Sequence, residues 1–244
     1  MPAAMEFTGR IETIRQSAAL MRQLLQGQQV VVCFGQRSLL TFFLAGHLEC
    51  EQVAGAFTTA DEALECMATG CVNVLLCSDQ LEQGCGLELV LAVKERHPAL
   101  RTLLLLTRQH RATRLRAVID SGCDGLLLDA NIGMGAAIST VQTVAQGGTV
   151  VDREIIDLLR DAGRNTREHG HLETLSNRER EVLTLLARGD DNSAIARQLV
   201  ISIETVRSHV KHLLLKLGAR GRTHAAVLAL ERGLVDWPAA RECR

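Results

Sequence analysis

The chain has 244 residues, 47% of them hydrophobic, and a formal net charge of −1, so it can bury one large core or two smaller ones. No run approaches about 18 consecutive apolar residues, and the N-terminus lacks the charged, apolar and cleavage segments of a signal peptide. We therefore expect a cytoplasmic protein that has no membrane partner.

The charge is distributed unevenly along the chain. Residues 176–222 carry nine basic and five acidic residues, whereas residues 1–170 carry 15 basic and 19 acidic ones. A positive module tethered to a negative one suits a protein that touches nucleic-acid phosphates with one end only.

The first half of the chain alternates two kinds of pattern. Residues 7–26 have a helical period, with Ile11, Ile14, Ala18, Met21 and Leu25 on one face. Short apolar runs then predict five strands, at Val30–Cys33, Cys50–Ala54, Val72–Cys77, Leu103–Thr107 and Gly125–Leu128. Helical periods between and after them predict helices at 37–48, 60–69, 87–96, 111–121 and 133–146. This alternation predicts an α/β domain, a parallel sheet covered by helices on both faces.

Ligands of such domains bind at the carboxyl ends of the strands. The residues expected there are Phe34, Gly35, Ser78, Asp79, Thr107 and Asp129.

This domain resembles the receiver domain of response regulators over roughly residues 28–148. The motifs that carry the resemblance are DEALECM (61–67), VNVLLCSDQLEQGCGLELV (72–90), HPALRTLLLLT (97–107), and SGCDGLLL followed by AAISTVQTVAQGG (121–148). The resemblance implies a flavodoxin-like (βα)5 fold. It also implies a site in which acidic residues bind Mg²⁺, an aspartate accepts a phosphoryl group and a lysine pairs with it.

The sequence departs from that pattern at nearly every functional position. The acidic pair falls on Phe34 and Gly35, the acceptor on Ser78 and the lysine on Asp129, while Thr107 is retained. Leu126 fills the aromatic position, and Lys94, inside a helix, is the sole lysine before residue 211. We therefore predict a pseudo-receiver. Asp79, one place past the acceptor position, is the alternative phosphorylation site, and a solvated loop residue is the competing interpretation.

Cysteine usage leaves a second alternative open. The eight cysteines show no zinc-type spacing, so we predict no metal and no cofactor. Cys33 and Cys77 end predicted strands and Cys85 follows the third, so a thiol pair could form a disulfide or hold a metal as a redox sensor. Thiols buried in the core of a protein kept in a reducing compartment are the competing interpretation.

The domain organisation follows from a loss of apolar residues after residue 151. Residues 152–172 begin like a helix and become strongly polar, which is typical of an interdomain connection, with the boundary near 165–172. We expect an N-terminal helix (1–27), a receiver-like domain (28–150), a linker (151–172) and a C-terminal domain (173–244).

The C-terminal domain reads as four short helices. Ser176 and Glu179 form a capping box at the start of the first, and Gly189 ends it. The second starts near Asn192 or Ser193; Ser202 caps the third, which Gly218 ends; and the fourth spans 223–232. Spacing alone also permits an ordinary amphipathic bundle with a solvated charged face.

Residues 175–226 closely resemble the LuxR/FixJ/NarL-type four-helix DNA-binding domain. They share LSNREREVLTLLARG, then IARQL, SIETVRSHV, KL and RTHAA. The resemblance implies that the third helix enters the major groove of double-stranded DNA, with Arg207, Ser208 and Lys211 at base edges and His209 alongside. It makes Thr205, Asn192, Lys216 and Arg222 candidate phosphate contacts, with a structural role as the alternative for Arg222. Glu179 is expected to be structural. The fourth helix pairs two copies in the family, which implies a homodimer.

These patterns predict a DNA-binding transcriptional regulator, not an enzyme, whose receiver-like domain does not use aspartyl phosphorylation. One alternative is a receiver-like domain that mainly binds a regulatory protein partner or dimerises; another is the redox response described above. A flavodoxin-like enzyme fused to a DNA reader is disfavoured, because the strand ends offer no glycine-rich phosphate loop and no nucleophile–base pair.

Overall fold

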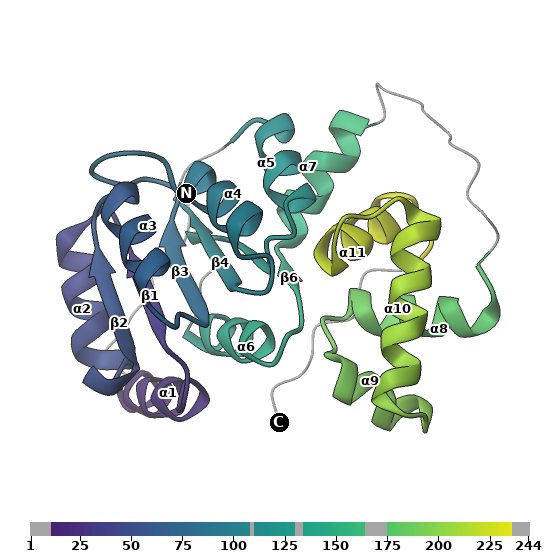
Figure 1. Cartoon of the computed structure of the whole chain (residues 1–244), viewed down its shortest axis with the longest axis horizontal. Helices are drawn as coiled ribbons and strands as arrows, with labels where there is room; N and C mark the ends of the chain where they lie inside the picture. Colours follow the sequence, from purple (N-terminus) through teal and green to yellow (C-terminus); the bar gives the residue numbers. More distant parts are fainter. Residues whose placement is uncertain (1–10, 108–109, 130–133, 164–174, 236–244) are drawn as a thin grey trace.

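A six-stranded parallel sheet forms the centre of the N-terminal domain (Figure 1). The computed structural model describes residues 11–107, 110–129, 134–163 and 175–235. The strands lie in the order β2-β1-β3-β4-β5-β6. Their bounds are β1 Val30–Cys33, β2 Val53–Phe57, β3 Val74–Ser78, β4 Arg101–Leu106, β5 Gly125–Leu128 and β6 Val150–Val151.

The sequence predicted five strands, and the sheet has a sixth. The predicted count is therefore wrong by one. The predicted bounds of β1 and β5 are confirmed, and β3 and β4 begin within two residues of expectation. β2 begins three residues late, because Cys50–Gln52 form a 3₁₀ turn capped by Glu49. The added strand, β6, pairs with β5 after a glycine turn, and two residues are too few to show a strand period.

Helices cover both faces of the sheet. Their bounds are α1 Ile11–Leu24, α2 Arg37–His47, α3 Ala60–Thr69, α4 Gly86–Arg96, α5 Ala112–Asp120, α6 Met134–Ala145 and α7 Arg153–Gly163. Along β1, Val31 and Cys33 join one core cluster, and Val30 and Val32 join the other. A strand buried on both faces needs apolar residues at every position, which explains the unbroken VVVC run.

Helix α1 belongs to the receiver-like domain. Its Met21, and Leu25 just after its end, are buried in the same core cluster as Val30 and Val32 of β1, and the helix packs on α6 and α2. Ala18 is buried on the same helix, as expected from the helical period. The predicted first residues of this helix, 7–10, lie outside the described residues.

The segment expected to begin the linker instead extends the domain. Residues 153–163 form α7, whose Ile155, Ile156 and Leu159 are buried. The predicted boundary at 165–172 falls outside the described residues. The core cluster that contains Leu75 of β3 and Ile156 of α7 also includes Val182 and Leu186 of the C-terminal domain, so the two domains share buried apolar surface.

The C-terminal domain has the four predicted helices: α8 Asn177–Ala187, α9 Asn192–Leu199, α10 Ile203–Leu217 and α11 Arg222–Glu231. Helices α8 and α10 pack on α11, and α9 packs on α10 (Figure 1). Among the described residues, no helix combines the length and the apolarity needed to cross a membrane.

Candidate nucleic-acid interface

Side-chain hydrogen bonds cap the N-termini of α8, α9 and α10. Ser176 Oγ accepts a hydrogen bond from Glu179 N, and Ser176 N donates to Glu179 Oε2, which confirms the predicted capping box. Asp191 caps α9 by accepting from Ala194 N, and the helix begins at Asn192, as expected. Ser202 caps α10 by accepting from Thr205 N, as predicted.

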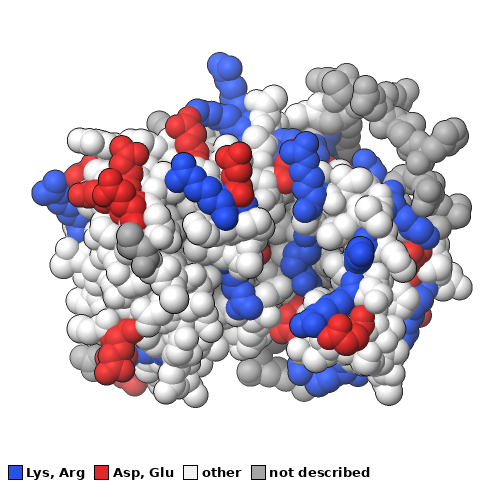
Figure 2. Space-filling model, viewed as in Figure 1, with Lys and Arg blue, Asp and Glu red and all other residues white. Residues whose placement is uncertain are grey.

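One face of α10 is exposed along the helix. Val206, Leu213 and Leu217 are buried against the rest of the domain, which leaves the opposite side in solvent. The residues exposed there are Glu204, Thr205, Arg207, Ser208, Lys211, His212 and Leu215. His209 is half-buried at the flank of this face. Figure 2 shows Lys and Arg side chains beside a smaller acidic group on the C-terminal domain.

The side chains on the exposed face of α10 make few hydrogen bonds or ion pairs to one another. Arg207 Nη1 donates to Glu204 Oε1 at 2.6 Å, one turn earlier, and both side chains are largely exposed. Exposed pairs of this kind contribute about 0–1 kcal/mol, so Arg207 can leave Glu204 for another partner at little cost. Ser208 Oγ donates to the carbonyl of Glu204, which keeps its acceptor lone pairs available.

Lys216 is held in place by Glu179. Lys216 Nζ lies 2.9 Å from Glu179 Oε2, and the carboxylate also accepts from Ser176 N. Hydrogen bonds from Lys216 and Ser176 outweigh burial and lower the pKa of Glu179 from 4.5 to about 2. Glu179 is therefore ionised at neutral pH and fixes the position of the lysine.

Asn192 and Arg222 bond to each other. Arg222 Nη1 donates to Asn192 Oδ1 at 3.3 Å, and Nη2 donates to the carbonyl of Asp190 at 2.5 Å. Burial lowers the pKa of Arg222, although nearby acidic groups oppose this effect. In this arrangement the pair joins the start of α11 to the start of α9.

The carboxyl edge of the sheet brings together most of the residues predicted there. Gly35, which follows Phe34, donates from its backbone N to the carbonyl of Gln80 and to Ser78 Oγ. The loop after β3 therefore packs directly against Gly35. A Cβ atom on Gly35 would lie 2.4 Å from the oxygen of Gln80 and 2.7 Å from Cα of Leu81. A larger side chain at this position has no room. Asp129 is exposed one residue past β5.

Asp79 is buried, and both of its carboxylate oxygens are hydrogen-bonded. Oδ1 accepts from Thr107 Oγ1 at 2.7 Å and from Thr107 N, and Oδ2 lies 2.6 Å from Nε2 of the buried His110. Burial alone would raise the pKa of Asp79, but the bonds from His110 and Thr107 outweigh it and hold the pKa below its usual value.

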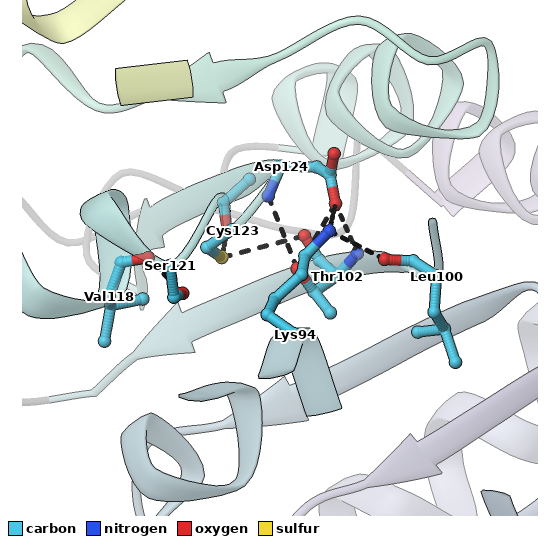
Figure 3. Close-up of polar contacts among 8 residues, drawn as sticks. Lys94, Leu100, Thr102, Val118, Ser121, Cys123 and Asp124 are labelled. Atoms are coloured by element: carbon cyan, nitrogen blue, oxygen red, sulfur yellow. Dashed lines mark hydrogen bonds and ion pairs between the residues drawn. The ribbon is translucent and has the colours of Figure 1, made fainter. Parts of the chain in front are cut away.

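Lys94 lies at the opposite edge of the sheet. Its Nζ donates to the carbonyl of Leu100 at 2.7 Å and to Asp124 Oδ2 at 2.6 Å (Figure 3). Asp124 also accepts from Thr102 N, and Cys123 Sγ points to the carbonyl of Thr102. Leu100 and Asp124 precede β4 and β5, so this ion pair joins the amino ends of the two strands.

The sequence profile of the family "Bacterial regulatory proteins, luxR family" matches residues 173–229, which contain α8 to α10 and most of α11. The nitrate/nitrite response regulator NarP of Escherichia coli is 30% identical over 161 residues, covering 66% of this chain and 74% of the relative. The chain belongs to the response regulators with a LuxR-type DNA-binding domain.

Other relatives of this response regulator agree in family. VraR of Staphylococcus aureus is 29% identical over 67% of this chain and 77% of the relative. A nitrate/nitrite response regulator homologue of Haemophilus influenzae is 35% identical, and the match spans 53% of this chain but only 61% of that protein. Among solved structures, RcsB of Salmonella typhimurium aligns with a TM-score of 0.46 at 22% identity, covering 79% of this chain and 92% of that chain. A complex of RcsB with DNA also aligns, with a TM-score of 0.46 at 21% identity, covering 84% and 98% of the two chains.

The structure of this response regulator also shows features that were not expected from its sequence. Val200, at the turn before α10, is 88% exposed in a left-handed conformation, and Leu215 is 73% exposed on the same face as Lys211. His110 was not identified as the partner of Asp79. The sequence does not distinguish exposed apolar side chains from those of the core. The Asp79–His110 pair joins residues 31 positions apart, so no local pattern contains it.

The thiols of the response regulator's core are poorly suited to react. Burial raises the pKa of Cys33 and of Cys123 to about 12, and raises that of Cys77 well above its usual value. At neutral pH these cysteines are protonated, and the thiolate is the reactive form. Cys85 is half-buried, whereas Cys50 and Cys71 are exposed.

Proposed function

We propose that the protein is a sequence-specific regulator of transcription that reads double-stranded DNA with α10. The observation that carries this proposal is the exposed face of α10, where Arg207, Ser208 and Lys211 lie side by side on a capped helix. Arginine and lysine reach guanine acceptors in the major groove, and serine reaches either kind of base edge. His209, at the flank, is the fourth candidate for this groove.

The same geometry supports two of the candidate phosphate contacts. Thr205 lies at the start of α10, and Lys216, positioned by Glu179, lies at its end, so the two would contact the DNA backbone on either side of the groove. The bond between Asn192 and Arg222 favours a structural role for that pair in the free protein. Their phosphate contacts would require Arg222 to leave Asn192.

The test uses a pool of DNA duplexes selected by the full chain, with affinity measured at one fixed salt concentration. Replacing Arg207 with Ala should weaken binding by about 1–3 kcal/mol and relax the preference at one base position. Arg114→Ala, an arginine on α5 that pairs with Glu88, is the matched control and should bind as the wild type does. Unchanged affinity and sequence preference in Arg207→Ala would refute the assignment.

We infer that the receiver-like domain does not use aspartyl phosphorylation. Three observations support this proposal: Gly35 has no room for a metal-binding carboxylate, Asp79 is engaged by Thr107 and His110, and Lys94 is bound at the other edge of the sheet. The residues present therefore do not fit Mg²⁺ and a phosphoryl group. Incubation with a small-molecule phosphodonor, followed by mass spectrometry, should give no stable adduct, while a phosphorylatable response regulator treated in parallel gives one. A phosphorylated Asp79 would contradict the proposal.

A second candidate role for the receiver-like domain is to bind a regulatory protein partner. Phe42 is 69% exposed on α2, and Leu39 on the same helix is also exposed, which favours an interaction surface there. The Phe42→Ser variant should then lose the partner while keeping its affinity for DNA. The redox role receives no such support, because Cys33 and Cys77 are buried thiols of raised pKa.

A further inference from the structure

Glu204 lies on the midline of the exposed face of α10. It precedes Lys211 by seven residues, which is close to two turns of about 3.6 residues, so the two side chains lie on one line along the helix. Arg207 and Ser208 follow Glu204 by three and four residues and lie on either side of that line. The side chains proposed to read bases therefore share their face with a carboxylate.

The Glu204 carboxylate is exposed and only partly used within the chain. Its side chain is 76% exposed, and its Oε1 accepts from Nη1 of Arg207 at 2.6 Å. Among the residues that the structure describes, this is the one hydrogen bond of the carboxylate, and Oε2 has no partner. Oε2 can therefore accept a hydrogen bond from a molecule that approaches α10.

The bond to Glu204 orients Arg207 without using up its donors. A guanidinium carries five N–H donors in a planar fork, and Glu204 takes one of them. The donors that remain can still pair with two acceptors of a base edge. A side chain that is already held in place loses less conformational entropy on binding, so the carboxylate prepares Arg207 for such a contact.

The spacing of Glu204 and Arg207 matches a step between base pairs. Residues three positions apart advance about 4.5 Å along a helix axis, and successive base pairs are about 3.4 Å apart. Two such side chains on a helix in the major groove therefore reach adjacent base pairs. Glu204 lies in the first turn of α10, and the first turn of a recognition helix is the part that contacts base edges.

The chemistry of a carboxylate restricts which base it can face. An ionised carboxylate accepts hydrogen bonds and donates none. In the major groove cytosine presents a 4-amino donor, whereas guanine and thymine present acceptors that repel a carboxylate, and the amino group of adenine lies beside the N7 acceptor. Cytosine is therefore the base that Glu204 matches best, as guanine is for Arg207.

We propose that Glu204 is a specificity-determining residue, which accepts a hydrogen bond from the 4-amino group of a cytosine and holds Arg207 on a guanine in the adjacent base pair. Glu204 adds selectivity at the expense of affinity, because its charge is repelled by the DNA phosphates. The inference names the sequence class that α10 reads, and it rests on the proposed DNA-reading function.

The test selects duplexes from a random pool with full-length proteins at one salt concentration, and then measures affinity for single base-pair variants of the selected duplex. The proteins are the wild type, Arg207→Ala, Glu204→Ala, Glu204→Gln and a control. Glu181→Ala is the matched control, because Glu181 on α8 accepts from Arg178 at the same spacing in sequence and at 2.6 Å, away from the reading face.

The wild type should prefer cytosine by about tenfold in the base pair next to the guanine whose preference Arg207→Ala removes. Glu204→Ala should reduce this preference to within about twofold and should bind unselected DNA about two- to fivefold more tightly, because a charge that phosphates repel is lost. Glu204→Gln should prefer adenine there, since an amide donates to N7 and accepts from the 6-amino group. Glu181→Ala should keep the wild-type preference.

A purely structural role of Glu204 gives a different result. A negative charge in the first turn stabilises a helix, and its loss would lower affinity for every duplex alike without changing the preference at one base pair. An unchanged cytosine preference in Glu204→Ala, or the absence of that preference in the wild type, overturns the proposal. A wild-type protein that selects no sequence at all would instead refute the reading function itself.

Discussion

At the turn between α9 and α10, Val200 adopts a backbone conformation that suits glycine or asparagine. Its φ is +54°, and it is the sole non-glycine residue with positive φ in the described ranges. A left-handed conformation costs an L-residue about 1–2 kcal/mol, and a β-branched side chain is among the least tolerant. The side chain is exposed and so contributes little burial in return.

We therefore expect Val200→Gly to stabilise the protein by about 0.5–1 kcal/mol, after allowing for the greater freedom of glycine in the unfolded chain. Gly218 is the left-handed cap at the end of α10, where φ is +65°. Gly218→Val makes the opposite substitution there and should destabilise the protein by about 1–2 kcal/mol. Urea unfolding of both variants measures the two effects. A loss of stability in Val200→Gly would show that its side chain makes contacts that outweigh the backbone strain.

Glu179 gives the DNA-binding domain a defined dependence on pH. Its pKa falls from 4.5 to about 2 on folding, so its contribution to stability is fully present above pH 4.5 and is lost as pH falls toward 2. Glu179→Gln should destabilise the protein at pH 7, and the difference from wild type should shrink between pH 4.5 and 2. Urea unfolding at several pH values checks this, with Glu204→Gln, an exposed carboxyl on α10, as the control. A difference independent of pH would exclude the charge as its cause.

The contacts made by these residues differ in how far apart the two partners lie in the sequence. The capping box joins Ser176 and Glu179, which are three positions apart, so its motif can be read from the sequence. The Arg116–Glu231 pair joins residues 115 positions apart, and no local pattern contains it. The sequence therefore predicts the exposed face of α10 and cannot predict which side of α11 the other domain covers.

At the scale of elements, the close approach of the β3–α4 loop to β1 sets what position 35 tolerates. Gly35→Ala forces a Cβ against the backbone of Gln80 and Leu81, which cannot rotate away, and should destabilise the protein by about 1–3 kcal/mol. Gly46→Ala, inside α2 with open space around it, should be neutral or stabilising by up to about 1 kcal/mol. Thermal unfolding of the two variants compares them directly. Equal effects would mean that the loop after β3 moves easily and that its packing against Gly35 is not tight.

The elements that could be predicted are those with a clear period. Strand β1 is apolar at every position, and α10 repeats its buried residues at three and four positions, so both were identified correctly. Strand β6 has two residues, and its pairing with β5 depends on the turn that precedes it. Helix α7 was read as the start of a linker because its polar face is strongly charged, whereas its buried face is matched by α5 and α11.

At the scale of the whole molecule, one core cluster runs through both domains. It includes Leu104 of the sheet, Ile156 of α7 and Leu186 of α8. We expect the domains to unfold together, so that hydrogen exchange in peptides from β4 and from α8 becomes global at the same denaturant concentration. Arg116→Glu should separate the two transitions, with α8 exchanging first, and Arg114→Glu should not. Separate transitions in the wild-type protein would contradict a shared core.

The burial of Lys94 determines where amine chemistry modifies this molecule. The chain has three lysines, Lys94, Lys211 and Lys216, and the side chain of Lys94 is 4% exposed in its bond to Asp124. Reagents that acylate lysines will therefore reach Lys211 and Lys216, both of which lie on α10. A protein coupled to a sensor surface through its lysines would be attached by α10, the helix that we propose reads DNA. Coupling through the exposed thiols of Cys50 or Cys71 on the receiver-like domain leaves that helix free.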